Sequence, residues 1–400
     1  MLRQYALLSF FLSFFILLSY IYSGLITPPP LGDSHDYHMP IAQDYLTGTV
    51  FNIPKSVNPF INFPGASESI LALFILFHIP VTWFCVFGST ILFLLLRKMG
   101  LHFNLGNELS LIYATAFTST LSVLREMDTQ SIDILMAVWF VLLVLLLENP
   151  KKTFKYFLFL GLVFGFLVGS KYTGIFYMII LLIVYGMRLI KLLNWSNVVS
   201  FLIPFVLVGV SWYIRNLIAR GDPLYPIPFL FFPGDQHIEN LNDYVLWKEL
   251  INGHGVIIFV ALLSEYLIWG LSFIPFLVLF FMNIKNKFLD AKTSRMFWLS
   301  FLLFISSFVM YSFKSTDYHF VVSNMRYIYS LIIMLTLALF MIAKKFKLGQ
   351  EIALLAVLNS IFVVSYIIYH PKLIIIYFII ASLIYLKGRK YLNRFISGAS

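Results

Sequence analysis

The chain has 400 residues, of which 60% are hydrophobic and 12% are charged, and its mean hydropathy is +0.89. Soluble domains carry about 25% charged residues, so this composition excludes a soluble globular protein and indicates a polytopic membrane protein. The formal net charge of +10 is spread over short loops and forms no basic arm, so we predict no nucleic-acid partner. The single cysteine, Cys85, lies in an apolar run and can form no internal disulfide.

The apolar runs predict an all-α fold with about twelve transmembrane helices. A bilayer core about 30 Å thick needs about 20 apolar residues in helical form. The first run is too long for a signal peptide and lacks a small-residue cleavage site, so we predict an uncleaved first span. The predicted spans cover residues 5–26, 70–96, 106–124, 131–147, 154–170, 173–193, 197–219, 256–283, 296–313, 326–343, 351–369 and 371–387.

Basic residues cluster at every second boundary between these spans. The clusters contain Arg3, Arg97, Lys98, Lys151, Lys152, Lys155, Arg188, Lys191, Lys285, Lys287, Lys292, Arg295, Lys344, Lys345, Lys347, Lys387, Arg389, Lys390 and Arg394. Because short cytoplasmic loops are enriched in Lys and Arg, both termini are predicted to be cytoplasmic. Residues 1–400 then form a single transmembrane domain with two long outer loops, 27–69 and 220–255. Loops of this kind carry function more often than the scaffold does.

The first outer loop predicts a short amphipathic helix after the prolines 28–30. Pro40 suits the first turn of such a helix, and Gly48 suits its C-terminal end. Tyr37, Ile41, Ala42 and Tyr45 fall near one face at helical spacing. We therefore expect this helix to lie in the plane of the membrane interface.

The densest polar cluster of this loop starts at Asp33, with Asp36 and two histidines, His35 and His38, close behind it. A carboxylate at a membrane surface can act as a general base, but Asp before a helix is also a common N-cap. Asp and His at this spacing could ligate a metal as a third alternative. The run matches no dedicated metal motif, so no cofactor is predicted.

Further ionisable residues lie near the predicted outer ends of the spans. Glu68 could orient a sugar hydroxyl, or be a solvated residue at a helix start. The others could snorkel to the interface or serve function, and the cations among them suit an anionic lipid head group, guanidinium groups through bidentate hydrogen bonds. These residues are Arg125, Glu126, Asp128, Asp133, Lys171, Tyr172, Arg215, Asn216, Arg326 and Tyr327.

Five segments, in this order, resemble motifs of the integral-membrane glycosyltransferases of the C-type fold. That superfamily includes the protein O-mannosyltransferases and the lipid A aminoarabinose transferases. The segments are Asp-Ser-His-Asp-Tyr-His-Met-Pro at 33–40, Asn-Phe-Pro-Gly-Ala-Ser-Glu at 62–68, Gly-Ser-Lys-Tyr-Thr-Gly at 169–174, the block 212–226 and Arg-Tyr at 326–327. The similarity covers roughly residues 1–345.

The chain departs from these motifs at two positions. Asp222 stands where an Asn is usual, and Ser34 follows Asp33 where many relatives carry an Asp-Glu pair. The second departure argues against a mechanism with two adjacent carboxylates.

The resemblance implies an inverting hexosyl- or pentosyltransferase with a polyprenyl-phosphate sugar donor. Asp33 would be the general base for an acceptor hydroxyl, on the outer or lumenal face of a prokaryotic plasma membrane. The acceptor would be a lipid, a glycan or a protein. The implied acceptor or supporting residues are His35, Asp36, Tyr37, His38 and Glu68. The implied donor-phosphate residues are Lys171, Tyr172, Arg215, Asn216, Arg326 and Tyr327.

Two alternatives remain open at this point. A polymerase or ligase of envelope glycans would use a lipid diphosphate donor and centre its polar residues on a large late outer loop. A transporter or lipid flippase would place ionisable residues near the midpoints of its spans. In this chain the densest cluster lies in the first outer loop, and the ionisable residues lie at the outer span ends, which favours the transferase.

Overall fold

The computed structural model describes residues 1–26, 28, 32–52, 58–228, 231–235, 246–258, 290–310 and 324–369. Within these ranges the chain forms helices and turns without extended strands, which confirms the predicted all-α fold. The α-helices are α1 (Leu2–Ile26), α2 (Met39–Thr47), α3 (Glu68–Leu76), α4 (Phe84–His102), α5 (Asn107–Thr118), α6 (Leu121–Glu126), α7 (Asp133–Glu148), α8 (Phe154–Ser170), α9 (Thr173–Ile190), α10 (Trp195–Phe205), α11 (Ser211–Arg220), α12 (Leu246–Ile251), α15 (Ala291–Met310), α17 (Tyr329–Lys345) and α18 (Gly349–Tyr369). Shorter 3-10 and π turns are η1 (Ser34–His38), η2 (Pro59–Asn62), η3 (Val81–Trp83), η4 (Val206–Val210) and η7 (Met325–Ile328).

Five described segments are long and apolar enough to cross a membrane: Leu2–Ile26, Val81–His102, Thr173–Ile190, Trp195–Arg220 and Met325–Lys345. The apolar helices Phe154–Ser170 and Gly349–Ile361 are shorter. The predicted spans at 256–283 and 371–387 lie almost wholly outside the described residues. The total of about twelve spans therefore stays a prediction, as does the single domain over residues 1–400.

Three predicted spans are not single straight helices. The run 70–96 is divided, because α3 ends at Leu76 and the chain turns before η3 and α4; His78 has a φ of 53° in this turn. The run 106–124 breaks between α5 and α6. The run 197–219 contains the π turn η4 just after Pro204, which lacks the N–H that a regular helix needs. Apolar length alone does not reveal these breaks.

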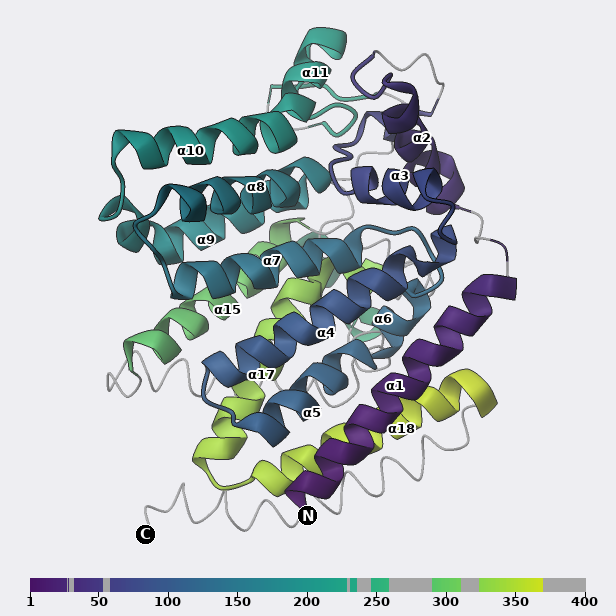
Figure 1. Ribbon diagram of the computed structural model, residues 1–400, viewed down its shortest axis with the longest axis vertical. Helices are drawn as coiled ribbons and strands as arrows, with labels where there is room; N and C mark the ends of the chain where they lie inside the picture. Colours follow the sequence, from purple (N-terminus) through teal and green to yellow (C-terminus); the bar gives the residue numbers. More distant parts are fainter. Residues whose placement is uncertain are drawn as a thin grey trace.

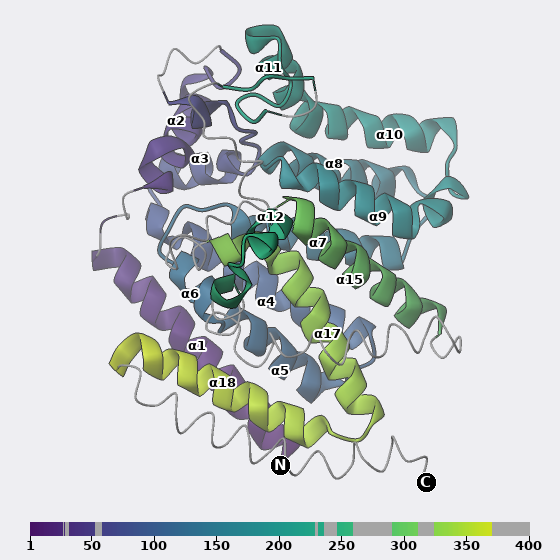
Figure 2. The same ribbon diagram turned by 180° about the vertical axis from the view of Figure 1, so that it is seen from behind.

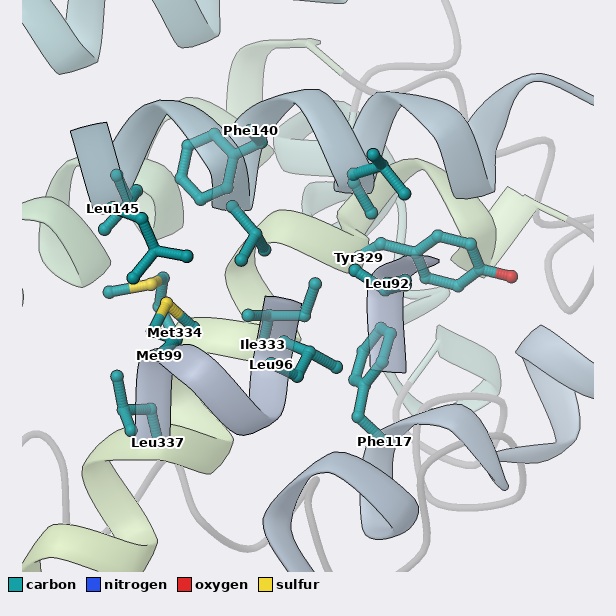
Figure 3. Close-up of a cluster of buried hydrophobic side chains, with 14 of the residues drawn as sticks. Leu92, Leu96, Met99, Phe117, Phe140, Leu145, Tyr329, Ile333, Met334 and Leu337 are labelled. Carbon is teal, nitrogen blue, oxygen red and sulfur yellow. The ribbon is translucent and has the colours of Figure 1, made fainter. Parts of the chain in front are cut away.

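The helices form a bundle in which α1 and α18 pack along one side, and α8, α9 and α10 along the other (Figures 1 and 2). The central core lies between them, where α4, α5, α7 and α17 meet (Figure 3). Its buried side chains include Leu92, Leu96, Met99, Phe117, Phe140, Leu145, Tyr329, Ile333, Met334 and Leu337. In a lipid solvent such helices are held together mainly by close van der Waals packing.

Helix α8 packs backbone to backbone against α10 and η4 through glycines at four-residue spacing. A Cβ on Gly161 would overlap the carbonyl oxygen of Phe201, and one on Gly165 would lie 3.0 Å from the Cβ of Val208. A Cβ on Gly169 would overlap the carbonyl oxygen of Val208. Small residues at this spacing allow two helices in a membrane to approach closely. This glycine seam fixes the C-terminal end of α8, from which Lys171 follows.

The short helix predicted in the first outer loop exists as α2. Pro40 lies in its first turn, and Gly48 ends it in the left-handed conformation with a φ of 71°. Its apolar side, however, packs on protein, because Tyr37 and Ile41 form a buried cluster with Ala66 and Trp212. Helices α2 and α3 lie together beside the end of α8, close to α11 (Figure 1). The apolar side of α2 is thus covered by protein, and the position of α2 in the plane of the membrane interface stays a prediction.

Candidate active site

Asp33 directly follows Gly32, whose backbone has a left-handed conformation that glycine adopts easily and other residues rarely do. Gly32 has a φ of 91°, and its carbonyl oxygen accepts hydrogen bonds from the backbone N–H groups of His35 (2.8 Å) and Asp36 (2.9 Å). The Asp33 side chain makes no capping hydrogen bond, so the alternative of a side-chain N-cap is wrong. Instead its Oδ2 accepts a hydrogen bond of 2.6 Å from Nη2 of Arg326.

Arg326, in η7 at the start of α17, is surrounded by three carboxylates. In addition to Asp33, its Nη1 lies 3.4 Å from Oε1 of Glu126, and its Nε lies 3.4 Å from Oδ2 of Asp133. Asp133 also accepts a hydrogen bond of 2.7 Å from Nζ of Lys171. We call these five residues the charge cluster. They are the residue before η1, the last residue of α6, the first residue of α7, the residue after α8, and a residue of η7.

The ring of Tyr327 lies under both cations of the charge cluster. Nζ of Lys171 is 4.1 Å from the ring centroid, and Cζ of Arg326 is 5.4 Å from it. Both distances are within the range of a cation–π interaction. The Tyr327 carbonyl oxygen accepts a hydrogen bond of 2.9 Å from the Tyr177 hydroxyl. The structure thus brings together Asp33, Lys171, Arg326 and Tyr327, which the sequence analysis placed in one site.

The other residues of the 33–38 run divide between surface and interior. His35 and Asp36 are exposed, whereas Tyr37 is buried against the rings of Phe60 and Phe63. Burial raises the pKa of the Tyr37 phenol well above its usual range, and the nearby Asp33 carboxylate raises it further. Tyr37 therefore stays a neutral hydrogen-bond donor at physiological pH.

His38 and Glu68 form a buried pair that joins α2 to α3. Nδ1 of His38 lies 2.8 Å from Oε1 of Glu68, and both side chains are about 2% exposed or less. Oε2 of Glu68 has no hydrogen-bond partner within the described ranges. The alternative of Glu68 as a solvated helix-start residue is therefore wrong, and the pair supports the loop from inside.

Three of the predicted phosphate residues, Tyr172, Arg215 and Asn216, form a separate network. Arg215 is buried and donates to the carbonyl oxygens of Val50 (3.1 Å) and Asn62 (2.9 Å). Asn216 donates to the Asn62 carbonyl oxygen and to the Tyr172 hydroxyl. These contacts bind the outer loops to α11, and among the described residues no hydrogen bond of this network reaches the charge cluster. The structure thus divides the predicted phosphate residues into two groups.

The two departures from the family motifs also have structural explanations. Asp222 is buried, and its carboxylate accepts hydrogen bonds from the backbone N–H groups of Leu224 (2.8 Å) and Gly234 (3.1 Å). These are acceptor roles that a carboxylate performs as well as an amide oxygen does. Ser34 is buried, and its Oγ accepts a hydrogen bond of 3.2 Å from the backbone N–H of Gln130. That bond attaches the loop between α6 and α7 to η1.

Glu126 and Asp133 are cluster members to which the sequence analysis assigned no site role. Their sequence signal was an ionisable side chain beside a span. Asp133 also accepts a hydrogen bond of 2.9 Å from Oγ of Ser131. Burial raises the pKa of the Glu126 carboxyl, and the Arg326 guanidinium partly offsets this effect.

Among the described residues, no group of three or more His, Cys, Asp or Glu side chains is placed to hold a metal ion. The charge cluster is instead a set of three carboxylates and two cations. Guanidinium and ammonium groups at such a position suit an oxyanion such as a phosphate.

A family model described as a domain of unknown function (DUF8201) matches residues 68–240. A search of curated protein sequences finds no match. The fold is similar to the crystal structure of ArnT from Cupriavidus metallidurans bound to undecaprenyl phosphate, with a TM-score of 0.54 and 12% sequence identity. The similarity covers 89% of this chain but 65% of the ArnT chain, so this chain spans less than two thirds of that protein. At this identity the similarity shows the fold alone: the helices of this chain are arranged like those of ArnT, a fold of the GT-C type.

Proposed function

We propose that this protein is a membrane glycosyltransferase that moves a sugar, with inversion, from a polyprenyl-phosphate donor to an acceptor hydroxyl. The observation that carries the proposal is the charge cluster, in which the half-exposed carboxylate of Asp33 contacts a cation suited to a phosphate. The fold adds support, because the ArnT structure that resembles it was bound to undecaprenyl phosphate.

In the proposed reaction Asp33 removes the proton from the acceptor hydroxyl. The hydroxyl oxygen forms a bond to the anomeric carbon of the donor sugar, while the bond from that carbon to the phosphate oxygen breaks. The polyprenyl phosphate leaves with the electron pair. A positioned general base typically contributes about 10²- to 10⁴-fold in rate. Arg326 and Lys171 would stabilise the negative charge that develops on the departing phosphate.

The surroundings of Asp33 suit an acceptor that approaches from outside the bundle. His35 and Asp36 are exposed next to it, and the neutral Tyr37 phenol lies beneath. We assign these residues to acceptor recognition, with a lipid, glycan or protein hydroxyl as the acceptor. The apolar tail of the donor would lie among the membrane lipids.

The position of the cluster also bears on the rival functions. Asp133 is the first residue of α7, Lys171 directly follows α8, and Arg326 lies in the first turn of the Met325–Lys345 segment. Charges at span ends suit chemistry at the membrane surface, whereas transporters bind their substrates near the bilayer midplane. The opposite ends of α1, α8, α9 and α17 carry the basic clusters that include Arg3, Lys155, Arg188 and Lys344, which supports an outer location for the site.

Replacing the base tests the proposal. Asp33→Asn keeps the side-chain volume but removes the basic oxygen, so sugar transfer from a radiolabelled polyprenyl-phosphate sugar should fall by about 100-fold or more. The matched control is Asp44→Asn in α2, whose carboxylate accepts a hydrogen bond from Thr49 and lies outside the charge cluster. Wild-type turnover by the Asp33→Asn protein would refute the role of Asp33.

Removing the cation tests the donor site. Arg326→Ala should weaken binding of undecaprenyl phosphate to the purified protein by about 10-fold or more, because hydrogen bonds to charged groups contribute about 1.5–3 kcal/mol. Arg220→Ala, at the exposed end of α11, is the control for general loss of positive charge. Unchanged affinity of the Arg326→Ala protein would remove Arg326 from the phosphate site.

A further inference from the structure

We propose that Asp33 and the donor phosphate compete for Arg326, so that binding of the donor releases the base. This inference rests on the proposed function and adds an order to it: the donor binds before Asp33 can serve the acceptor. The observation behind it is that the base and the phosphate-binding cation are joined by an ion pair of 2.6 Å between Asp33 and Arg326.

Among the three carboxylates around Arg326, Asp33 is the one that can leave. Its side chain is 46% exposed, whereas those of Glu126 and Asp133 are 10% and 6% exposed. A buried carboxylate that loses its cation suffers a large desolvation cost, but an exposed one is solvated by water. Burial therefore holds Glu126 and Asp133 in place and leaves Asp33 free to exchange.

The hydrogen bonds of the three carboxylates point the same way. Glu126 is also held by Oγ1 of Thr129 at 3.4 Å, and Asp133 by Oγ of Ser131 and Nζ of Lys171. For Asp33, the side-chain hydrogen bond that the structure describes is the one from Arg326. Asp33 also lies at the start of the helical segment that η1 and α2 form, directly after Gly32. A change of the Asp33 side-chain rotamer would separate its carboxylate from Arg326.

Charge balance favours exchange with Asp33 over simple addition of the phosphate to the cluster. With ionised side chains the cluster holds three negative and two positive charges, so an added phosphate would meet a negative site. A sugar–phosphate–lipid is a phosphodiester with one negative charge, the same as the Asp33 carboxylate. Replacement of Asp33 by the phosphate at Arg326 therefore keeps the charge around the guanidinium constant. It also frees both Asp33 oxygens to face the acceptor.

The test measures binding of undecaprenyl phosphate to the purified full chain in lipid nanodiscs. Because Asp33→Asn removes the competing charge, this variant should bind the lipid phosphate about 3- to 20-fold more tightly than the wild type, as expected for a partly exposed ion pair. The gain should vanish in the Asp33→Asn/Arg326→Ala double variant. Asp44→Asn, which removes a carboxylate of α2 outside the charge cluster, should change the affinity by less than about twofold.

The outcomes separate the two proposals. Equal or weaker binding by Asp33→Asn, together with lost binding by Arg326→Ala, would overturn the competition and leave the phosphate site intact. An equal gain from Asp44→Asn would also overturn it, since the effect would then be one of overall charge. Unchanged binding by Arg326→Ala would refute the phosphate site itself. Asp33→Ala provides a second variant with the same expectation, and the unfolding temperature of each protein verifies its fold.

Discussion

At the scale of single residues, the environment of each ionisable side chain decides its role. Glu126 ends α6 and lies within 3.4 Å of Arg326, yet its carboxyl has a raised pKa because the cost of burial exceeds the attraction of the guanidinium. The folded protein therefore binds the Glu126 proton more tightly than the unfolded chain does. The ionised form of Glu126 therefore stabilises the folded protein less than the protonated form does, although it is the form that pairs with Arg326.

This balance predicts a pH dependence that Glu126→Gln should remove. Below the pKa of an unfolded Glu, at about 4.3, the wild-type side chain is protonated in both states and the two proteins should have similar stability. As the pH rises from there through the raised folded pKa, the wild type should lose stability relative to Glu126→Gln. Unfolding temperatures in detergent between pH 4 and pH 8 measure this difference.

A wild type that gains stability over Glu126→Gln as the pH rises would contradict the raised pKa. It would mean that the ion pair with Arg326 outweighs the burial of Glu126. Asp44→Asn, which removes an outer carboxylate away from the cluster, controls for the general effect of pH on this face.

At the scale of elements, α8 links sequence to site most directly. Its start is set by Thr153, whose Oγ1 accepts a hydrogen bond of 3.3 Å from the backbone N–H of Tyr156. Its end is held by the glycine seam and by a 2.8 Å hydrogen bond from the Ala66 backbone N–H to the Gly169 carbonyl oxygen. A shift of α8 would therefore move both Lys171 and the start of α3.

The glycine seam predicts that even a methyl group disrupts this element. Gly161→Ala would place a Cβ onto the Phe201 carbonyl oxygen, so the helices must separate, at a cost of about 1–3 kcal/mol. The unfolding temperature should fall, and transfer activity should fall with it as Lys171 is displaced. Thermal unfolding and the transfer assay on the same preparation measure both effects.

Gly186 in α9 provides the matched control, because a Cβ there would have no atom within 4 Å. Gly186→Ala should leave stability unchanged or raise it by about 0.5–1 kcal/mol, since alanine favours a helix. Equal unfolding temperatures of the Gly161→Ala and Gly186→Ala proteins would show that the close packing of α8 on α10 does not stabilise the protein.

At the scale of the whole molecule, a second buried ionic group lies at the end of the bundle opposite the charge cluster. Asp133 and Glu148 are the first and last residues of α7, and its 16 residues separate them by about 22 Å. Glu148 accepts hydrogen bonds of 3.0 and 2.7 Å from Arg295 of α15, and Arg188 of α9 lies 3.7 Å away. His102 of α4 lies 3.8 Å from the same carboxylate. One side chain thus joins the ends of four helices.

Loss of the Glu148 charge should therefore destabilise the whole bundle. In Glu148→Gln two arginines would remain beside a neutral amide, and breaking a buried ion pair costs about 3–5 kcal/mol. Glu108→Gln in the first turn of α5 should cost less than about 1 kcal/mol. Thermal unfolding measures both. Equal stability of the two variants would show that the Glu148 group contributes no net stability.

The sequence by itself determined the class of protein and most helix positions. Long apolar runs must become helices in a bilayer, because each backbone N–H and C=O there needs an internal partner. The predicted runs 154–170 and 351–369 therefore agree closely with α8 and α18. The motif order placed Asp33, Lys171 and Arg326 in one site, and the structure does bring their side chains into one cluster.

Tertiary structure alone decided how the polar residues are distributed among sites. Sequence spacing cannot show that Arg215 and Asn216 bind loop carbonyls, or that Glu126 and Asp133 surround Arg326, because these contacts join segments more than 150 residues apart. Sequence spacing also cannot show whether an apolar helix face packs on lipid or on protein, because both environments favour the same residues. Asp33 changed from a possible helix cap to the partner of Arg326 for the same reason: its partner comes from η7, far along the chain, and not from its own turn.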